Sequence, residues 1–165
     1  MSSDPSTPPS VPTGETRPAA LVSLERTAIF PQEKAAALLQ AACYFKPEGI
    51  TGYWTPTAQD LDGVEDSLEK FLGIQGRPKR GNWQNYRRQV AGLQKDAERF
   101  LFISYFVPEA VPVDKKPGAQ NDPGDDPDRW KREAYWINDG GDTYFRVMYD
   151  LQKREFSWYE RNSDP

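Results

Sequence analysis

The first amphipathic pattern predicts a helix over residues 31–44. Four apolar side chains fall on one stripe at the three- and four-residue spacing of a buried helical face: Ala35, Leu38, Leu39 and Ala42. Pro31 suits a first helical turn, and Glu33 places negative charge near the positive end of the helix dipole. The Gly-containing stretch 46–53 interrupts the pattern and ends this helix.

The second amphipathic pattern predicts a helix over residues 57–72. Its buried face is formed by Leu61, Val64, Leu68, Phe71 and Leu72. Thr55 or Thr57 provides a capping side chain, and Pro56 suits the first helical position.

After residue 85 the apolar period changes to two, which is typical of strands. Five alternating runs follow: 85–93, 99–107, 130–138, 143–151 and 154–162. Residues 21–30 are apolar enough to add an edge strand before the helices. Two helices followed by a meander predict an α+β fold, with both helices on a curved antiparallel sheet of about 4–5 strands. By element order this arrangement is cystatin-like or NTF2-like.

The sequence predicts one domain with a tail. Residues 1–20 are rich in Ser, Thr and Pro and are expected to be disordered, which leaves 21–165 as the domain. A long acidic Pro/Gly loop is expected at 108–129. No apolar run is long enough for a membrane span, and no signal peptide is evident. As written the chain reads as cytoplasmic, or as exported if a leader was removed before residue 1.

The stretch Asp139-Gly140-Gly141-Asp142 predicts a tight hairpin between the third and fourth runs. This register sets Trp136 opposite Phe145 and Ala134 opposite Val147. The core face would then carry Ala134, Trp136, Phe145, Val147 and Tyr149. The outward face would carry Tyr135, Ile137, Tyr144, Arg146 and Met148.

A metal site is the competing interpretation of these aspartates. It would use Asp139, Asp142 and Asp150, with Asp122, Asp125, Asp126 and Asp128 from the long loop. The spacing of an EF-hand is missing, and a chain with no histidine and one cysteine lacks the usual zinc ligands. We therefore expect no metal and no cofactor.

The sequence favours a non-catalytic function. Zero histidines remove the commonest general base and every Ser-His or Cys-His pair. Cys43 falls in the first helix, where a small buried thiol is the ordinary interpretation. Four carboxylates on the second helix could do acid–base work but are interpreted as a solvated face: Asp62, Glu65, Asp66 and Glu69.

The segment 77–95 carries six basic residues and no acidic one, interleaved with Trp83 and Tyr86. Arg87 and Arg88 beside these rings would suit weak nucleic-acid binding. Because the net charge is −4, a solvated linker with a charged edge strand is the favoured interpretation. An acidic partner protein, or the chain's own acidic loop, could also face this segment.

The motifs together resemble a group of small bacterial proteins to which no activity is attached. The resemblance rests on Tyr53-Trp54-Thr55-Pro56, Tyr86-x-Arg88-Gln89, and Asp139-Gly140-Gly141 followed by an aromatic strand ending in Tyr149-Asp150. It covers residues 53–161 and implies a shared fold without a mechanism.

The functional hypothesis is a binding protein that uses an exposed aromatic and arginine-bearing sheet face. The residues expected there are Tyr135, Tyr144, Arg146 and Met148, with Trp83, Arg87 and Arg88 in the basic segment. Aromatic and arginine side chains are enriched among interface hot spots, so a partner protein is the expected ligand. The alternative is a small pocket enzyme or ligand carrier with a cavity between helix and sheet. The oligomeric state is left open.

Overall fold

A computed structural model describes residues 24–41, 47–75, 83–108, 126–135 and 141–162 of the 165-residue chain. These ranges contain two α-helices, α1 (Gln32–Ala41) and α2 (Val64–Gln75). The strands are β1 (Thr27–Ile29), β2 (Gly52–Trp54), β3 (Arg87–Lys95), β4 (Glu98–Phe106), β5 (Tyr144–Asp150) and β6 (Glu155–Arg161). Short 3-10 helices include η2 (Ala58–Leu61), η4 (Arg129–Lys131) and η5 (Gly141–Thr143).

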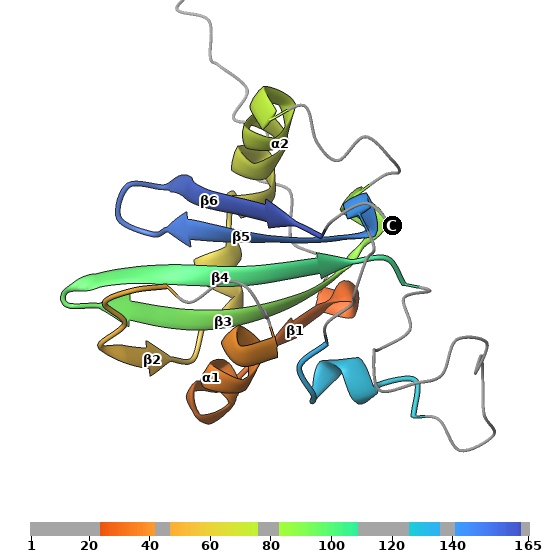
Figure 1. Cartoon of the computed structure of the whole chain (residues 1–165), viewed down its shortest axis with the longest axis horizontal. Helices are drawn as coiled ribbons and strands as arrows, with labels where there is room; N and C mark the ends of the chain where they lie inside the picture. The colour runs from red at the N-terminus through yellow and green to blue at the C-terminus, as the bar shows by residue number, and fades with distance from the viewer. Residues whose placement is uncertain (1–23, 42–46, 76–82, 109–125, 136–140, 163–165) are drawn as a thin grey trace, which may run out of the picture.

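The six strands form one open sheet in the order β1-β3-β4-β5-β6 (Figure 1). Both β1 and β2 pair with the same edge of β3, at opposite ends of that strand. The β1–β3 pair is parallel and the other pairs are antiparallel. The predicted α+β class with helices packed on a sheet is therefore confirmed, and the sheet is mixed rather than purely antiparallel.

The two helices cover opposite faces of the sheet (Figure 1). On what we call the α1 face, the core includes Leu38, Leu39, Ala91, Leu93, Phe100, Phe102 and Met148. On the α2 face, it includes Leu61, Val64, Leu68, Leu72, Leu101, Ile103, Phe145, Val147 and Tyr149. Apolar side chains of β4 and β5 alternate between the two faces of the sheet and are buried on both, so each helix has a core to pack against.

Both predicted helices exist, but the second is divided. Helix α1 lies within the predicted 31–44, while the predicted 57–72 helix is a 3-10 turn, η2, followed by α2. The interruption falls at Gly63, whose φ of +75° is incompatible with a helix. Thr57 caps η2, whereas the hydroxyl of Thr55 accepts the N–H of Gln32 and so satisfies the first turn of α1.

The strands at 85–93 and 99–107 are confirmed as β3 and β4, joined by a two-residue turn at Asp96 and Ala97. The edge strand expected within 21–30 is β1. Interpretation of the basic strand as an edge strand is wrong, because β3 has neighbours on both sides. Strand β2 was missed because three residues are too short to show a period.

In its described part, 130–135, the strand predicted at 130–138 is wrong, and so is its hairpin with β5. Residues 129–131 form η4, and 132–135 are irregular. Val147 pairs with Ile103 and Tyr159 rather than with Ala134, because β4 and β6 occupy both sides of β5. Residues 126–135, which we call the strap, instead pack on the α1 face at the β1 end (Figure 1).

Several predictions fall outside the described residues. They concern the 1–20 tail, Cys43, most of the 108–129 loop, Trp136, Ile137, Asp139, Gly140, Asp122 and Asp125. Gly141 is described; it has a φ of +52° and begins η5 instead of closing the predicted hairpin.

Candidate functional site

A cleft of about 590 Å³ lies where the β3–β4 and β5–β6 turns meet the segment before α2. It is lined by Gln59, Asp60, Asp62, Arg99, Tyr149, Leu151, Gln152 and Arg154. Its volume falls in the range of about 300–1,000 Å³ that is usual for small-molecule sites.

One wall of the cleft comes from η2 and the bend after it. The Asp60 carboxylate accepts hydrogen bonds from the backbone N–H and the hydroxyl of Thr57, both at 2.7 Å. This capping arrangement holds a single 3-10 turn in place. Gly63 then bends the chain into α2, which leaves the side chain of Asp62 on the rim.

The opposite wall comes from two hairpin turns that are tied together. Leu151 donates its N–H to the carbonyl of Arg99 at 3.1 Å, and Arg99 donates its N–H to Oε1 of Gln152 at 3.1 Å. The side-chain amide of Gln152 also donates to the carbonyl of Ala97 at 3.4 Å. The backbone that carries Arg99 and Arg154 is therefore fixed before any ligand arrives.

Asp150 sets the shape of the β5–β6 turn. Its Oδ1 accepts the backbone N–H groups of Gln152 at 2.9 Å and Lys153 at 3.0 Å, and its Oδ2 pairs with Lys153 Nζ at 3.1 Å. Burial raises the pKa of Asp150, but the hydrogen bonds and charge of Lys153 outweigh it, so the pKa lies below its ordinary value. The carboxylate is thus ionised in the folded turn.

Tyr149 contributes a buried polar group to the cleft wall. The residue is 2% exposed and packs against the ring of Phe156, with centroids 4.9 Å apart. Its hydroxyl has no hydrogen-bond partner in the described part of the chain. An unmade hydrogen bond of a buried hydroxyl costs about 1–3 kcal/mol, so such groups in native proteins call for an explanation.

Three charged rim groups are also uncommitted. Within the described ranges, the side chains of Arg99, Arg154 and Asp62 form no ion pair and no hydrogen bond. The guanidinium of Arg99 instead stacks on Trp54, with Cζ 3.5 Å from the ring centroid. The cleft therefore offers donors and one acceptor that are free to meet a ligand.

The outward sheet face expected at Tyr144, Arg146 and Met148 is not exposed. These side chains are buried, with 1%, 2% and 5% of their surface exposed. Arg146 pairs with Glu160 at 3.1 Å, and Tyr135 is half-buried and stacked on Phe106. The prediction of an exposed patch is wrong because the α1 face is a second core, which strand alternation alone does not reveal.

The basic segment does not form a surface stripe in its described part. Trp83 is buried, and Arg88, 2% exposed, forms an ion pair with Glu65 of α2. Arg87 lies on the other face, with Cζ 5.0 Å from the ring centroid of Trp130. Glu65 is therefore a partner of a buried cation and not part of a solvated face.

Burial also shifts pKa values around the ion pair of Arg88 and Glu65. It raises the pKa of Tyr105 to about 12, although the neighbouring Arg88 opposes the shift. It lowers the pKa of Arg88 from its ordinary value. This cluster lies in the α2-face core, and its groups serve packing between α2 and the sheet.

The described aspartates of the proposed metal set are dispersed. Asp126 and Asp128 pair with Arg132 and Lys131 inside the strap, Asp142 lies 3.8 Å from Arg161, and Asp150 holds its turn. Among the residues that the structure describes, no three carboxylate or thiol groups gather around a common point suited to a metal.

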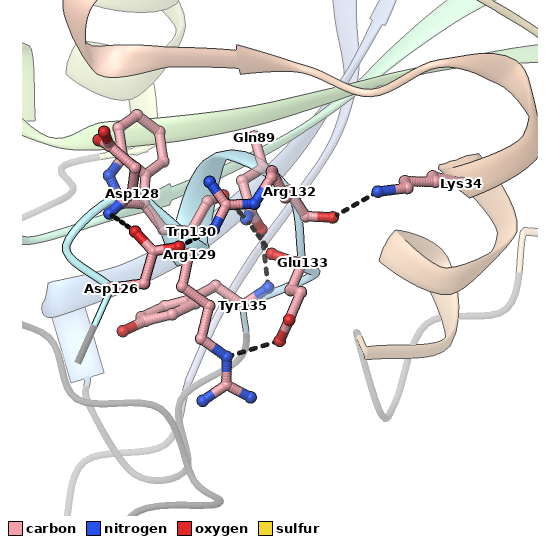
Figure 2. A network of polar contacts seen from close by, with 9 residues as sticks. All are labelled: Lys34, Gln89, Asp126, Asp128, Arg129, Trp130, Arg132, Glu133 and Tyr135. Atoms are coloured by element: carbon pink, nitrogen blue, oxygen red, sulfur yellow. Dashed lines mark hydrogen bonds and ion pairs between the residues drawn. The ribbon is translucent and has the colours of Figure 1, made fainter. Parts of the chain in front are cut away.

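Gln89 fastens the strap through its side-chain amide (Figure 2). The NH₂ group donates to the carbonyls of Trp130 and Glu133, and the amide oxygen accepts the N–H of Tyr135 at 2.8 Å. Lys34 of α1 adds a hydrogen bond to the carbonyl of Arg132 at 3.0 Å (Figure 2). The Gln of the Tyr86-x-Arg88-Gln89 motif is therefore structural.

Searches of protein-family models, curated proteins and solved structures found no match for the chain. Neither α1 nor α2 is long and apolar enough to cross a membrane. The site must consequently be interpreted from its own residues. Sequence reasoning missed it because its lining comes from three separated segments, and no motif marks Arg99, Tyr149 or Arg154.

Proposed function

We propose that the protein is a non-catalytic binding protein whose cleft takes a small polar molecule. The observation that carries the proposal is a 590 Å³ cleft lined by Arg99, Arg154 and Asp62, whose side chains form no hydrogen bond or ion pair within the described chain. A small polar molecule in the cleft would meet these groups without breaking a bond that folding has already made.

The proposal changes the place of binding that the sequence favoured. Tyr144, Arg146 and Met148 are core residues, so a partner cannot meet them on the surface. The space between α2 and the sheet is filled by aliphatic and aromatic side chains, so the carrier hypothesis moves from that layer to the turn end. Binding there needs no general base, which agrees with a chain that has no histidine.

The test is an NMR titration of the isotope-labelled full chain with a set of small polar fragments. We expect amide shift changes at 59–62, Arg99 and 151–154, and weaker binding by Asp62→Asn. Asp66→Asn is the matched control, because it removes an exposed carboxylate that lies outside the cleft lining. Fragment responses confined to other regions, or equal affinity for Asp62→Asn, would contradict the proposal.

A further inference from the structure

We infer that the ligand of the cleft carries an oxyanion, a carboxylate or a phosphate, held between Arg99 and Arg154. This inference rests on the proposed function and adds the chemical class of the ligand. It follows from how the two guanidinium groups are held and from which charges around them are already used.

Arg99 is positioned as a preorganised donor. Its guanidinium lies over Trp54 at 3.5 Å, and that ring is itself fixed, because Nε1 donates to the carbonyl of Leu93 at 3.0 Å. Gly92 supports the ring from beneath, since a Cβ there would come within 2.6 Å of its atoms. A stacked guanidinium keeps its in-plane N–H donors free, and that geometry matches a carboxylate or phosphate edge.

Arg154 is placed by backbone geometry. It adopts a φ of +56°, which is uncommon for a residue with a side chain, at the end of the turn that Asp150 holds. Its Nη2 lies 3.3 Å from the position that a Cβ on Gly63 would occupy. Gly63 thus makes room for the guanidinium beside the cleft, and no described carboxylate neutralises it.

The lining holds two arginines and two aspartates, so its formal charges balance, and an oxyanion would be recognised by the guanidinium donors. Oδ2 of Asp60 already accepts two hydrogen bonds from Thr57. The side chains of Arg99, Arg154 and Asp62 stay available. An oxyanion between the arginines leaves Asp62 to accept a hydrogen bond from a hydroxyl or ammonium group on the same molecule.

The size of the cleft and the overall charge point to a small molecule. A volume of about 590 Å³ holds a single compact ligand. The net charge of −4 supplies no long-range attraction for polyanions, so recognition depends on these local donors.

The experiment titrates the labelled full chain with succinate, with inorganic phosphate and with neutral succinamide. We expect Nε–Hε shifts at Arg99 and Arg154 with one or both anions, and weaker binding of succinamide. Stronger binding of succinate assigns a carboxylate ligand, and stronger binding of phosphate assigns a phosphate ligand.

Matched variants distinguish binding by Arg99 and Arg154 from a general effect of the protein's charge. We expect Arg99→Gln and Arg154→Gln to weaken anion binding about ten-fold or more each, and Arg99→Lys to weaken it less. Arg132→Gln, an exposed arginine of the strap, should bind like the wild type. Urea midpoints of all variants verify that they fold.

Three results would overturn the oxyanion assignment. Equal binding of succinamide and succinate in the cleft would reject the oxyanion and leave the proposed function standing. Anion binding that Arg99→Gln and Arg154→Gln do not change would show an adventitious ion only. No response to any of the three compounds would overturn the inference, and the fragment titration would then decide the proposed function separately.

Discussion

The strap and the cleft are two polar regions at opposite ends of the same sheet, and they differ in how their hydrogen bonds are used. At the strap, both N–H groups and the oxygen of the Gln89 side chain meet backbone partners. At the cleft, the hydroxyl of Tyr149 and the guanidinium groups of Arg99 and Arg154 meet none in the described chain.

This difference separates a structural network from a candidate site. A closed network is satisfied by folding alone, and it stabilises one arrangement of the chain. At the cleft the Tyr149 hydroxyl is buried and its unmade hydrogen bond costs stability, while the exposed guanidinium groups of Arg99 and Arg154 stay available to a ligand. The comparison predicts that removing the hydrogen-bonding group lowers stability at Gln89 and does not lower it at Tyr149.

The largest effect on stability is expected at the strap, where the hydrogen bonds of Gln89 are all used. Gln89→Ala removes one buried and two part-buried hydrogen bonds to the strap backbone, which we expect to cost about 3 kcal/mol of unfolding free energy. Gln94→Ala is the control, because its amide donates at an exposed turn, and the loss should stay under about 1 kcal/mol. Urea unfolding measures both, and equal losses would contradict a closed network.

The second largest effect is expected at Gly92, which packs against the Trp54 ring that carries Arg99. Gly92→Ala places a Cβ 2.4 Å from the carbonyl oxygen of Trp54, so the ring that carries Arg99 must shift. We expect a loss of about 2–3 kcal/mol and weaker ligand binding. Gly73→Ala is the matched control, because Gly73 is an exposed position of α2 with open space around it, and it should gain about 0.5–1 kcal/mol. If Gly92→Ala is as stable as the wild type and binds the ligand equally well, the close packing of Gly92 on Trp54 is not needed to position Arg99.

Two buried tyrosines allow a direct comparison of a used and an unused hydroxyl. The hydroxyl of Tyr86 donates to the carbonyl of Asp142 at 3.0 Å, so Tyr86→Phe should cost about 1 kcal/mol. Tyr149→Phe should leave stability unchanged or raise it by up to about 1 kcal/mol. Thermal or urea unfolding measures both variants. If Tyr149→Phe loses as much unfolding free energy as Tyr86→Phe, the hydroxyl of Tyr149 already has a hydrogen-bond partner.

The turn at Asp150 should make stability depend on pH. Its pKa is lowered from 3.8 on folding, so its contribution is present above that value and is lost as pH falls through the lower folded pKa. We expect the urea midpoint to fall between about pH 5 and pH 3, and less steeply in Asp150→Asn. If the urea midpoint of both proteins depends on pH with the same slope, Asp150 does not contribute to the pH dependence of stability.

The smallest effect is expected at an exposed ion pair of the strap. Arg132 pairs with Asp126, and both side chains are largely exposed to solvent, 57% and 43%. Arg132→Gln should therefore change the unfolding free energy by less than about 0.5 kcal/mol. A larger loss would show that surface charge, and not Gln89, holds the strap.

Local patterns determined much of the fold. Apolar stripes at helical spacing identified α1 and α2, and period-two alternation identified β3, β4, β5 and β6. These signals succeed because each depends on a residue's neighbours in the chain. The same reasoning placed Phe145, Val147 and Tyr149 correctly on a core face.

Only the tertiary structure decided which alternating runs pair and which faces are covered. The 130–138 run has the period of a strand, yet β6 and β4 take both sides of β5, and Gln89 binds 130–135 as a strap. Likewise Arg146 looks like a surface residue in the sequence but is buried beside Glu160.

The candidate site was decided wholly by the tertiary structure. Whether the guanidinium of Arg99 or Arg154 has a partner depends on which separate segments of the chain, 59–62, 99 and 149–154, fold side by side. Sequence determined the chemical groups that the protein carries. Packing decided which of them are used up by folding and which are left for a ligand.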